Sequence, residues 1–266
     1  MRTGIVDFHI HPFLHSENNY CHYKDRYTLD ISAARARLEG LGIAAVCGSV
    51  IGPVSNWADI VRLNNRALEL REQWSDFYVP GFHIHPDYVQ ESVAQIEKMA
   101  CQGIKLLGEV VPYMHGWDFA HPGLVPILEA AQEAGMVFSF HSTGIPNEVM
   151  EILLTRFPEL TFVAAHPGEK TALMTHLDRM ERHKNYFLDL SGSGLGRMGM
   201  LRYAIDRAGK ERFLFGTDFP ICPPEMYVAV VDGDPLLTEE EKQAVFHCNA
   251  QHILEESVQN CSKFIR

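Results

Sequence analysis

The sequence lacks paired cysteines, an excess of positive charge and any long apolar run. Its six cysteines are scattered with no CxxC pair, which argues against a disulfide scaffold and favours reduced thiols. The 23 Lys and Arg residues against 34 Asp and Glu give a net charge of −11, and such a surface repels phosphate backbones. No apolar stretch approaches the roughly 20 residues that span a bilayer, and the opening segment MRTGIVDFHIHP lacks a signal-peptide layout. We therefore expect a cytoplasmic protein with neither a nucleic-acid nor a membrane partner.

The composition is that of a globular protein rich in histidine. Of the 266 residues, 46% are hydrophobic and 21% are charged, which excludes a disordered chain and a membrane bundle. The histidine count of 14 is high. At this length we expect one domain spanning residues 1–266, because α/β barrels often use about 250 residues for a single domain.

Eight short apolar runs alternate with segments of helical periodicity. Helical spacing of apolar residues marks 31–41, 59–74, 88–102, 123–135, 148–157 and 238–254. Strict alternation of strand and helix predicts a parallel sheet covered by helices, and eight units fit a closed (β/α)8 TIM barrel. An open doubly wound sheet is the alternative, but the first strand–helix turn carries no GxGxxG. The predicted strands are 5–10, 43–50, 77–83, 103–109, 136–141, 161–166, 186–190 and 213–217.

Five of the eight predicted strands end in a side chain that can bind a metal ion. Active sites of such barrels lie at the C-terminal ends of the strands. His9 and His11 are two residues apart, so a regular strand points both imidazoles to the same side, into the barrel. Imidazole and carboxylate ligands together suit a divalent metal, and we expect zinc, as one or two ions, with manganese, iron, nickel or cobalt as alternatives. The predicted ligands are His9, His11, Glu109, His141, His166 and Asp218.

These motifs resemble those of a known enzyme family. VDFHIHP at the first strand, His141 and His166 at the fifth and sixth, and GTDFP at the eighth are similar to the amidohydrolase superfamily, in particular its amidohydrolase-related (type 2) branch. The resemblance implies that His9, His11 and His141 hold the metal. It also implies that Asp218 is a further ligand and the general base. His166 would complete a second metal position or polarise the substrate.

Two residues of the fourth predicted strand, Lys105 and Glu109, are candidates for its metal ligand. Binuclear members of the superfamily bridge their metals there with a carboxylated lysine or a glutamate. Lys105 and Glu109 share one face of a regular strand but lie roughly 13 Å apart along it. Glu109, at the strand end, is our choice for the bridge. Lys105 is expected either in a buried ion pair deep in the barrel or, if the strand ends earlier, as a ligand or substrate-binding cation.

Substrate contacts are expected from the loops that follow the strands. The loop after the fourth strand carries His115 and Trp117, which suit contact with a substrate ring or a neighbouring subunit. Arg197, in a glycine-rich loop, suits a carboxylate or phosphate. His83 is expected near the substrate, whereas Glu169 is expected to cap a helix.

The predicted function is hydrolysis of an amide, ester, lactone or phosphoester in a small polar substrate by metal-activated water, with Asp218 as general base. The main alternative is a non-oxidative metal-dependent decarboxylase of an aromatic or unsaturated acid, which Arg197 and Trp117 favour and Glu109 opposes. A TatD-type nuclease is a further alternative, suggested by GEVVPY, but FHSTG and GTDFP depart from that branch. A non-catalytic metal-binding protein is disfavoured by Asp218. The oligomeric state stays open, with a homo-oligomer as one alternative.

Overall fold

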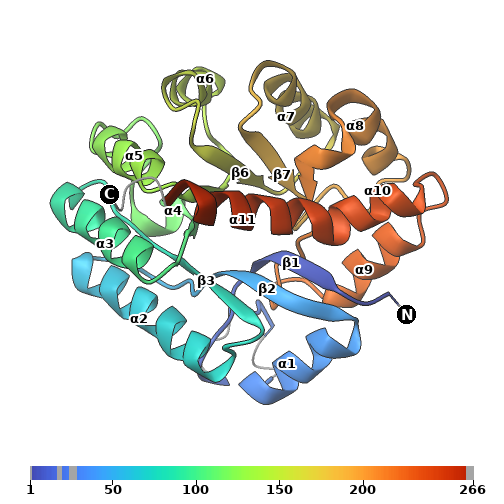
Figure 1. The fold of residues 1–266 in the computed structure, drawn as a ribbon, viewed down its shortest axis with the longest axis horizontal. Coiled ribbons are helices and arrows are strands. Elements are labelled where there is room, and N and C mark those ends of the chain that lie inside the picture. The colour runs from blue at the N-terminus through green and yellow to red at the C-terminus, as the bar shows by residue number, and fades with distance from the viewer. Residues whose placement is uncertain (1, 17–19, 24–28, 262–266) are drawn as a thin grey trace.

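The computed structural model describes residues 2–16, 20–23 and 29–261, with the side chains of 256–261 left out. Eight parallel strands lie side by side in chain order and form a barrel inside a ring of helices (Figure 1). The (β/α)8 architecture is therefore confirmed, and most strands begin and end within two residues of their predicted bounds. The strands are β1 Ile5–Ile10, β2 Ile43–Ser49, β3 Tyr78–Phe82, β4 Leu106–Val110, β5 Val137–His141, β6 Thr161–Ala165, β7 Tyr186–Asp189 and β8 Phe213–Leu214.

Polar side chains cap the start of three of the helices. Asp30 and Asn56 accept hydrogen bonds from the first turns of their helices, and Thr238 forms a capping box with Glu241. The predicted last helix, 238–254, is divided by a π-helical turn, η3. None of the described helices is long and apolar enough to cross a lipid bilayer. The helices are α1 Ile31–Gly40, α2 Trp57–Gln73, α3 Val89–Cys101, α4 Pro112–His115, α5 Leu124–Glu133, α6 Asn147–Arg156, α7 Lys170–Arg182, α8 Met200–Ala208, α9 Pro224–Asp232, α10 Glu239–Gln243, η3 Ala244–Cys248 and α11 Asn249–Cys261, with a 3₁₀ turn η2 at Lys210–Arg212.

Helix α11 lies across one end of the barrel (Figure 1). Its Ala250 and Ile253 pack against apolar side chains from the barrel interior, to which all eight strands contribute. Several of these interior residues, among them Val6, Leu106 and Val137, lie at the N-terminal ends of their strands. The N-terminal end of the barrel is therefore plugged, and the opposite end carries the polar strand ends.

The barrel closes between β1 and the segment that follows β8. Only Phe213 and Leu214 belong to the ladder with β7, whereas the sequence predicted a strand over 213–217. The chain then turns towards its neighbours: the backbone N–H of Phe215 donates to Val245 of η3, and the carbonyl of Phe215 accepts from Phe8. The N–H of Asp218 donates to the carbonyl of His9 over 2.8 Å. This seam places Asp218 beside the end of β1.

Candidate metal centre

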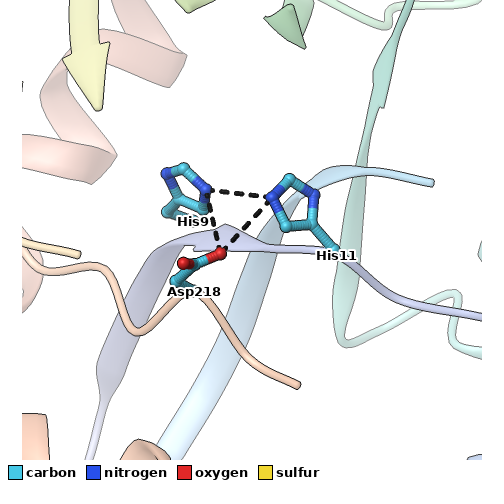
Figure 2. A group of neighbouring side chains, drawn as sticks. All are labelled: His9, His11 and Asp218. Carbon is cyan, nitrogen blue, oxygen red and sulfur yellow. Dashed lines mark hydrogen bonds and ion pairs between the residues drawn. The ribbon is translucent and has the colours of Figure 1, made fainter. Parts of the chain in front are cut away.

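Four ligand atoms converge at the open end of the barrel. The Nε2 atoms of His9 and His11 lie 3.2 Å apart. Asp218 Oδ1 lies 3.7 Å from His9 Nε2 and 3.4 Å from His11 Nε2, as Figure 2 shows. Glu109 Oε2 lies 3.4 Å and 3.2 Å from the same two nitrogens. The sequence predicted these four residues as ligands, and the structure brings them together.

The remaining two predicted ligands surround the other carboxylate oxygen of Glu109. His141 Nδ1 lies 3.2 Å from Glu109 Oε1, and His166 Nε2 lies 3.7 Å from it. The six residues therefore form two overlapping groups that share Glu109. Two sets of ligand atoms close enough to hold an ion, one of His9, His11 and Asp218 and one of His9, Glu109 and His166, occur among the described residues.

Hydrogen bonds behind the cluster decide which ring nitrogens face it. His9 Nδ1 lies 2.9 Å from Asp189 Oδ2, and His11 Nδ1 lies 3.1 Å from the carbonyl oxygen of Ser49. Oxygens of a carboxylate and a carbonyl only accept, so both Nδ1 atoms carry the hydrogen. In their neutral forms, both Nε2 atoms then present lone pairs to the same point. Two acceptors at 3.2 Å repel one another unless a cation or a proton lies between them.

The electrostatics agree with a site built for positive charge. Burial alone would lower the pKa of His9, but the charges of Asp189 and Glu109 raise it well above its ordinary value. Burial alone would raise the pKa of Glu109, yet the charge of His9 and hydrogen bonds from His11 and His141 hold it well below its usual range. Three buried carboxylates, Glu109, Asp189 and Asp218, face this histidine cluster. In the metal-free protein, a proton on His9 therefore supplies part of the charge that a metal would bring.

Irregularities in β1 and β4 turn two of these predicted ligands, His9 and Glu109, into the barrel. The pairing of β1 with β2 shifts register between Asp7 and Ile10, and that of β4 with β5 shifts between Leu107 and Val110. Bulges of this kind re-aim side chains and are common beside active sites. Gly108 lies inside the second shift with φ of 107°, and a Cβ there would sit 2.0 Å from the carbonyl oxygen of Ser139. Only glycine fits at this position.

This bulge overturns the predicted position of Lys105. Leu106 faces the barrel interior, so the side chain of Lys105 points to the helix layer rather than sharing a face with Glu109. Its Nζ donates to the carbonyl of Ala134, which ends α5 at the N-terminal side of β5. A lysine at this place satisfies the last carbonyls of a helix. Lys105 is therefore neither an ion-pair partner inside the barrel nor within reach of the metal cluster.

His166 and Asp218 have left-handed backbones, with φ of 69° and 60°. For residues other than glycine such conformations cost on the order of 1–3 kcal/mol and cluster at functional sites. Burial raises the pKa of Asp218 and lowers that of His166. The ring of His166 lies against Gly192, where a Cβ would sit 2.4 Å from Nδ1. Their roles as catalytic residues stay predictions.

Two residues that contact the cluster were missed by the sequence analysis. Asp189, at the end of β7, contacts His9, and Ser191 Oγ lies 3.1 Å from His9 Nδ1 and 3.0 Å from His166 Nδ1. Both side chains are fully buried. The signal was present, since DLS follows an apolar run at the strand end, but neither residue belongs to the motifs that carried the family resemblance.

Arg197 does not lie where a substrate-binding cation was expected. Its side chain is exposed and forms an ion pair with Glu169, at 2.6 Å between Nη2 and Oε1. The described cavities that it lines include none of the six cluster residues. Glu169 occupies the N-cap of α7 but makes no side-chain capping bond, because its carboxylate is held by Arg197. The predicted position of Glu169 at the start of a helix is therefore confirmed, but its side chain does not form the expected cap.

The other predicted substrate residues flank the cluster. His83 and His115 are buried, with ring centroids 5.1 Å apart, and their burial lowers their pKa values to about 4 and about 3. Trp117 and Tyr113 line a cavity of about 210 Å³ together with His141. The Nε2 atom of His85 forms a hydrogen bond with the backbone carbonyl of His115. Contact of His83, His115 or Trp117 with a substrate stays a prediction.

The donor set fits a divalent metal. Imidazole nitrogens and carboxylate oxygens meet with their lone pairs directed at common points, and the hydrogen bonds behind His9 and His11 are those that orient metal-bound histidines. When bound, a divalent ion polarises a coordinated oxygen and stabilises negative charge that develops on it.

The chain matches a known protein family in sequence and several solved structures in fold. A family model described as Amidohydrolase matches residues 6–255. No curated protein sequence matches the chain. Similar solved structures include 2,6-dihydroxybenzoate decarboxylase from Rhizobium, with 14% identity, a TM-score of 0.73 and coverage of 96% of this chain and 99% of that one. The 5-carboxyvanillate decarboxylase LigW from Sphingomonas paucimobilis is 18% identical, with a TM-score of 0.72 and coverage of 94% and 98%. A dihydroxybenzoic acid decarboxylase from Polaromonas sp. JS666, with bound manganese and 2-nitroresorcinol as inhibitor, is 14% identical, with a TM-score of 0.69 and coverage of 95% and 97%. At these identities the likeness establishes a shared fold.

Proposed function

Because this chain belongs to the amidohydrolase family, we propose that it is a metal-dependent decarboxylase of a small aromatic acid. The observation that carries the proposal is the cavity beside His141. Three aromatic side chains, Tyr113, Trp117 and Phe119, line this space of about 210 Å³, and Tyr113 packs its ring 5.1 Å from that of His141. A flat ring placed there would lie beside His141, one of the six cluster residues. The decarboxylases of similar fold act on aromatic acids, which supports this choice over the hydrolase predicted from the sequence.

The reaction needs a proton donor at carbon. The bond between the ring carbon and the carboxylate breaks, carbon dioxide leaves, and the ring carbon takes up one proton. In the metal-free fold, burial raises the pKa of Asp218, so that its protonated form persists at higher pH than for an exposed aspartate, which suits a proton donor. His166 lies on the opposite side of Glu109 and suits a hydrogen bond to the substrate.

His9, His11, Glu109, His141 and Asp218 would hold the metal. Manganese and zinc both accept nitrogen and carboxylate ligands. The Polaromonas enzyme binds manganese, so we propose manganese ahead of the zinc expected from the sequence.

Hydrolysis is the second candidate, and Glu109 favours it. Its two carboxylate oxygens face different histidines, Oε2 towards His11 and Oε1 towards His141. A carboxylate so placed suits a bridge between two ions, and two-metal sites stabilise attacking and leaving oxygens of a hydrolytic reaction. In this reading Asp218 acts as the general base that takes a proton from water.

One experiment separates the two candidates. The protein is stripped of metal, reloaded with Mn²⁺ or Zn²⁺, and incubated with 2,6-dihydroxybenzoate, 5-carboxyvanillate and other hydroxybenzoates, and in parallel with lactones and esters. Metal-dependent release of carbon dioxide that Asp218→Asn abolishes supports decarboxylation. Turnover of lactones or esters alone supports hydrolysis. An exposed, distant variant, Glu129→Gln, serves as the control. Full activity of Asp218→Asn would contradict its role in either reaction.

A further inference from the structure

We infer that Asp189 and Ser191 form a positioning pair that fixes the ring tautomers of both His9 and His166. Asp189 ends β7, and Ser191 follows two residues later, so one segment reaches two histidines of the centre that come from different strands. Neither residue belongs to the predicted ligand set. The inference deepens the proposed function and concerns the same metal centre, but its test does not depend on which reaction the enzyme performs.

The carboxylate of Asp189 acts as acceptor throughout. Its Oδ2 accepts from His9 Nδ1 over 2.9 Å, and its Oδ1 accepts from the backbone N–H of Ser191 over 3.0 Å. The hydroxyl of Ser191 also donates to Oδ1. Three donors around one buried carboxylate satisfy it as an anion.

The hydroxyl of Ser191 therefore donates its only hydrogen to Asp189. Its oxygen can then only accept from the two imidazoles beside it, His9 Nδ1 at 3.1 Å and His166 Nδ1 at 3.0 Å. The hydrogen of His166 must therefore reside on Nδ1, which leaves the lone pair of its Nε2 directed at the cluster. Because one serine oxygen serves both rings, a change at Ser191 affects His9 and His166 together.

Packing keeps His166 on this serine. The backbone of His166 has a φ of 69°, and its ring lies against Gly192, the residue next to Ser191. The hydroxyl of Ser142 contacts the backbone carbonyls of Ala165 and His166. The ring thus meets Ser191 in one orientation, and no rotation is needed to present Nε2.

The direct test is the protonation pattern of His166 in the metal-free protein. The protein is expressed with ¹⁵N-histidine and stripped of metal with a chelator. Its ring signals are assigned by comparison with the His166→Gln variant. We expect the hydrogen of neutral His166 on Nδ1 and an unprotonated Nε2. If His166 of the wild-type protein carries its hydrogen on Nε2, the inference is wrong. This result requires no variant at Ser191.

Metal affinity supplies the second readout. Titration of Mn²⁺ and Zn²⁺ into metal-free protein should give Ser191→Ala a 10- to 100-fold weaker affinity, the usual effect of losing a partner behind a metal-bound histidine. Ser191→Thr, which retains the hydroxyl, should restore most of it. Ser193→Ala, which removes an exposed hydroxyl two residues away, is the matched control. Equal affinities for Ser191→Ala and Ser193→Ala would contradict the proposal, whereas a loss in Ser191→Ala together with a shift of His166 to the Nε2–H tautomer would support it.

Discussion

The Nε2 atom of His9 lies 3.2 Å from the Nε2 atom of His11, although both are hydrogen-bond acceptors in the neutral rings. Such an arrangement is stabilised by a cation between the two nitrogens. Removing the metal with a chelator should therefore lower the thermal stability of the protein. With metal at a thousandfold excess over Kd, the expected loss is about 4 kcal/mol, or on the order of 10 °C in Tm for a chain of this size. Differential scanning calorimetry before and after chelation measures it, and an unchanged Tm would contradict a tightly held ion.

Metal affinity should rise with pH. The pKa of His9 is raised well above its ordinary 6.5 in the metal-free fold, against the effect of burial, by the charges of Asp189 and Glu109. A metal must displace that proton, so affinity should increase by about tenfold per pH unit until His9 deprotonates. The same proton stabilises the metal-free fold fully below pH 6.5, and this contribution is lost as pH rises through the pKa of the folded state. Calorimetric titration from pH 6 to 9 tests this, and a flat profile would argue against His9 as the proton's site.

Glu109→Gln should separate one-metal from two-metal chemistry. If Glu109 bridges two ions, the amide should cost one equivalent of metal and most of the activity. If it accepts hydrogen bonds only, metal content should stay the same. Elemental analysis of the reloaded protein gives the stoichiometry, with Glu129→Gln as the surface control. A single equivalent in both wild type and Glu109→Gln would count against the hydrolytic candidate.

Gly192→Ala should impair the site more than the fold. The added Cβ would lie 2.4 Å from His166 Nδ1, and the φ of 64° at this residue disfavours any side chain. We expect activity to fall at least tenfold while the circular dichroism spectrum is retained. Gly196→Ala, in the same loop with no atom within 4 Å of its added Cβ, should behave as wild type. Equal activity of the two variants would show that Gly192 does not hold the ring of His166 in place.

Acid should destabilise the fold partly through His115. Burial, helped by the charges of His83 and His85, lowers the pKa of His115 to about 3. The unfolded chain binds this proton near pH 6.5, so stability falls as pH drops from about 6.5 towards 3, by about 2 kcal/mol at pH 5 for this one group. His115→Phe should flatten that part of the stability curve in urea unfolding. A slope identical to that of the wild type would show that His115 is not buried in its neutral form.

The fold could be predicted from the sequence because its strands and helices carry regular patterns. Each apolar run between helices became a strand, and the polar residues that ended five of them proved to meet at one end of the barrel. His9, His11, Glu109 and Asp218 could be found from their places at strand ends, although the inward direction of His9 and Glu109 depends on the register shifts in β1 and β4. The shorter β8 was not foreseeable, since the N–H of Phe215 donates to Val245 of η3, which lies 30 residues further along the chain.

The errors come from features that a regular pattern does not contain. Lys105 and Glu109 share a face only if β4 is regular, and the register shift around Gly108 places them on different sides. Arg197 looked available for an anion because its partner, Glu169, lies 28 residues away in the sequence. Asp189 and Ser191 were missed because their roles depend on which side chains approach from β1 and β6.

A metal bound at the seam between β1 and the segment after β8 would stabilise the closure of the barrel. His9 lies in β1, His11 follows its end, and Asp218 lies in the segment after β8, so an ion held by all three would join the two ends of the barrel sheet. Contacts so distant along the chain form late and at a high cost in chain entropy. Losing the ion should therefore loosen the barrel first along this line, and amide hydrogen exchange at Phe8, His11 and Asp218 should accelerate before that of the other strands.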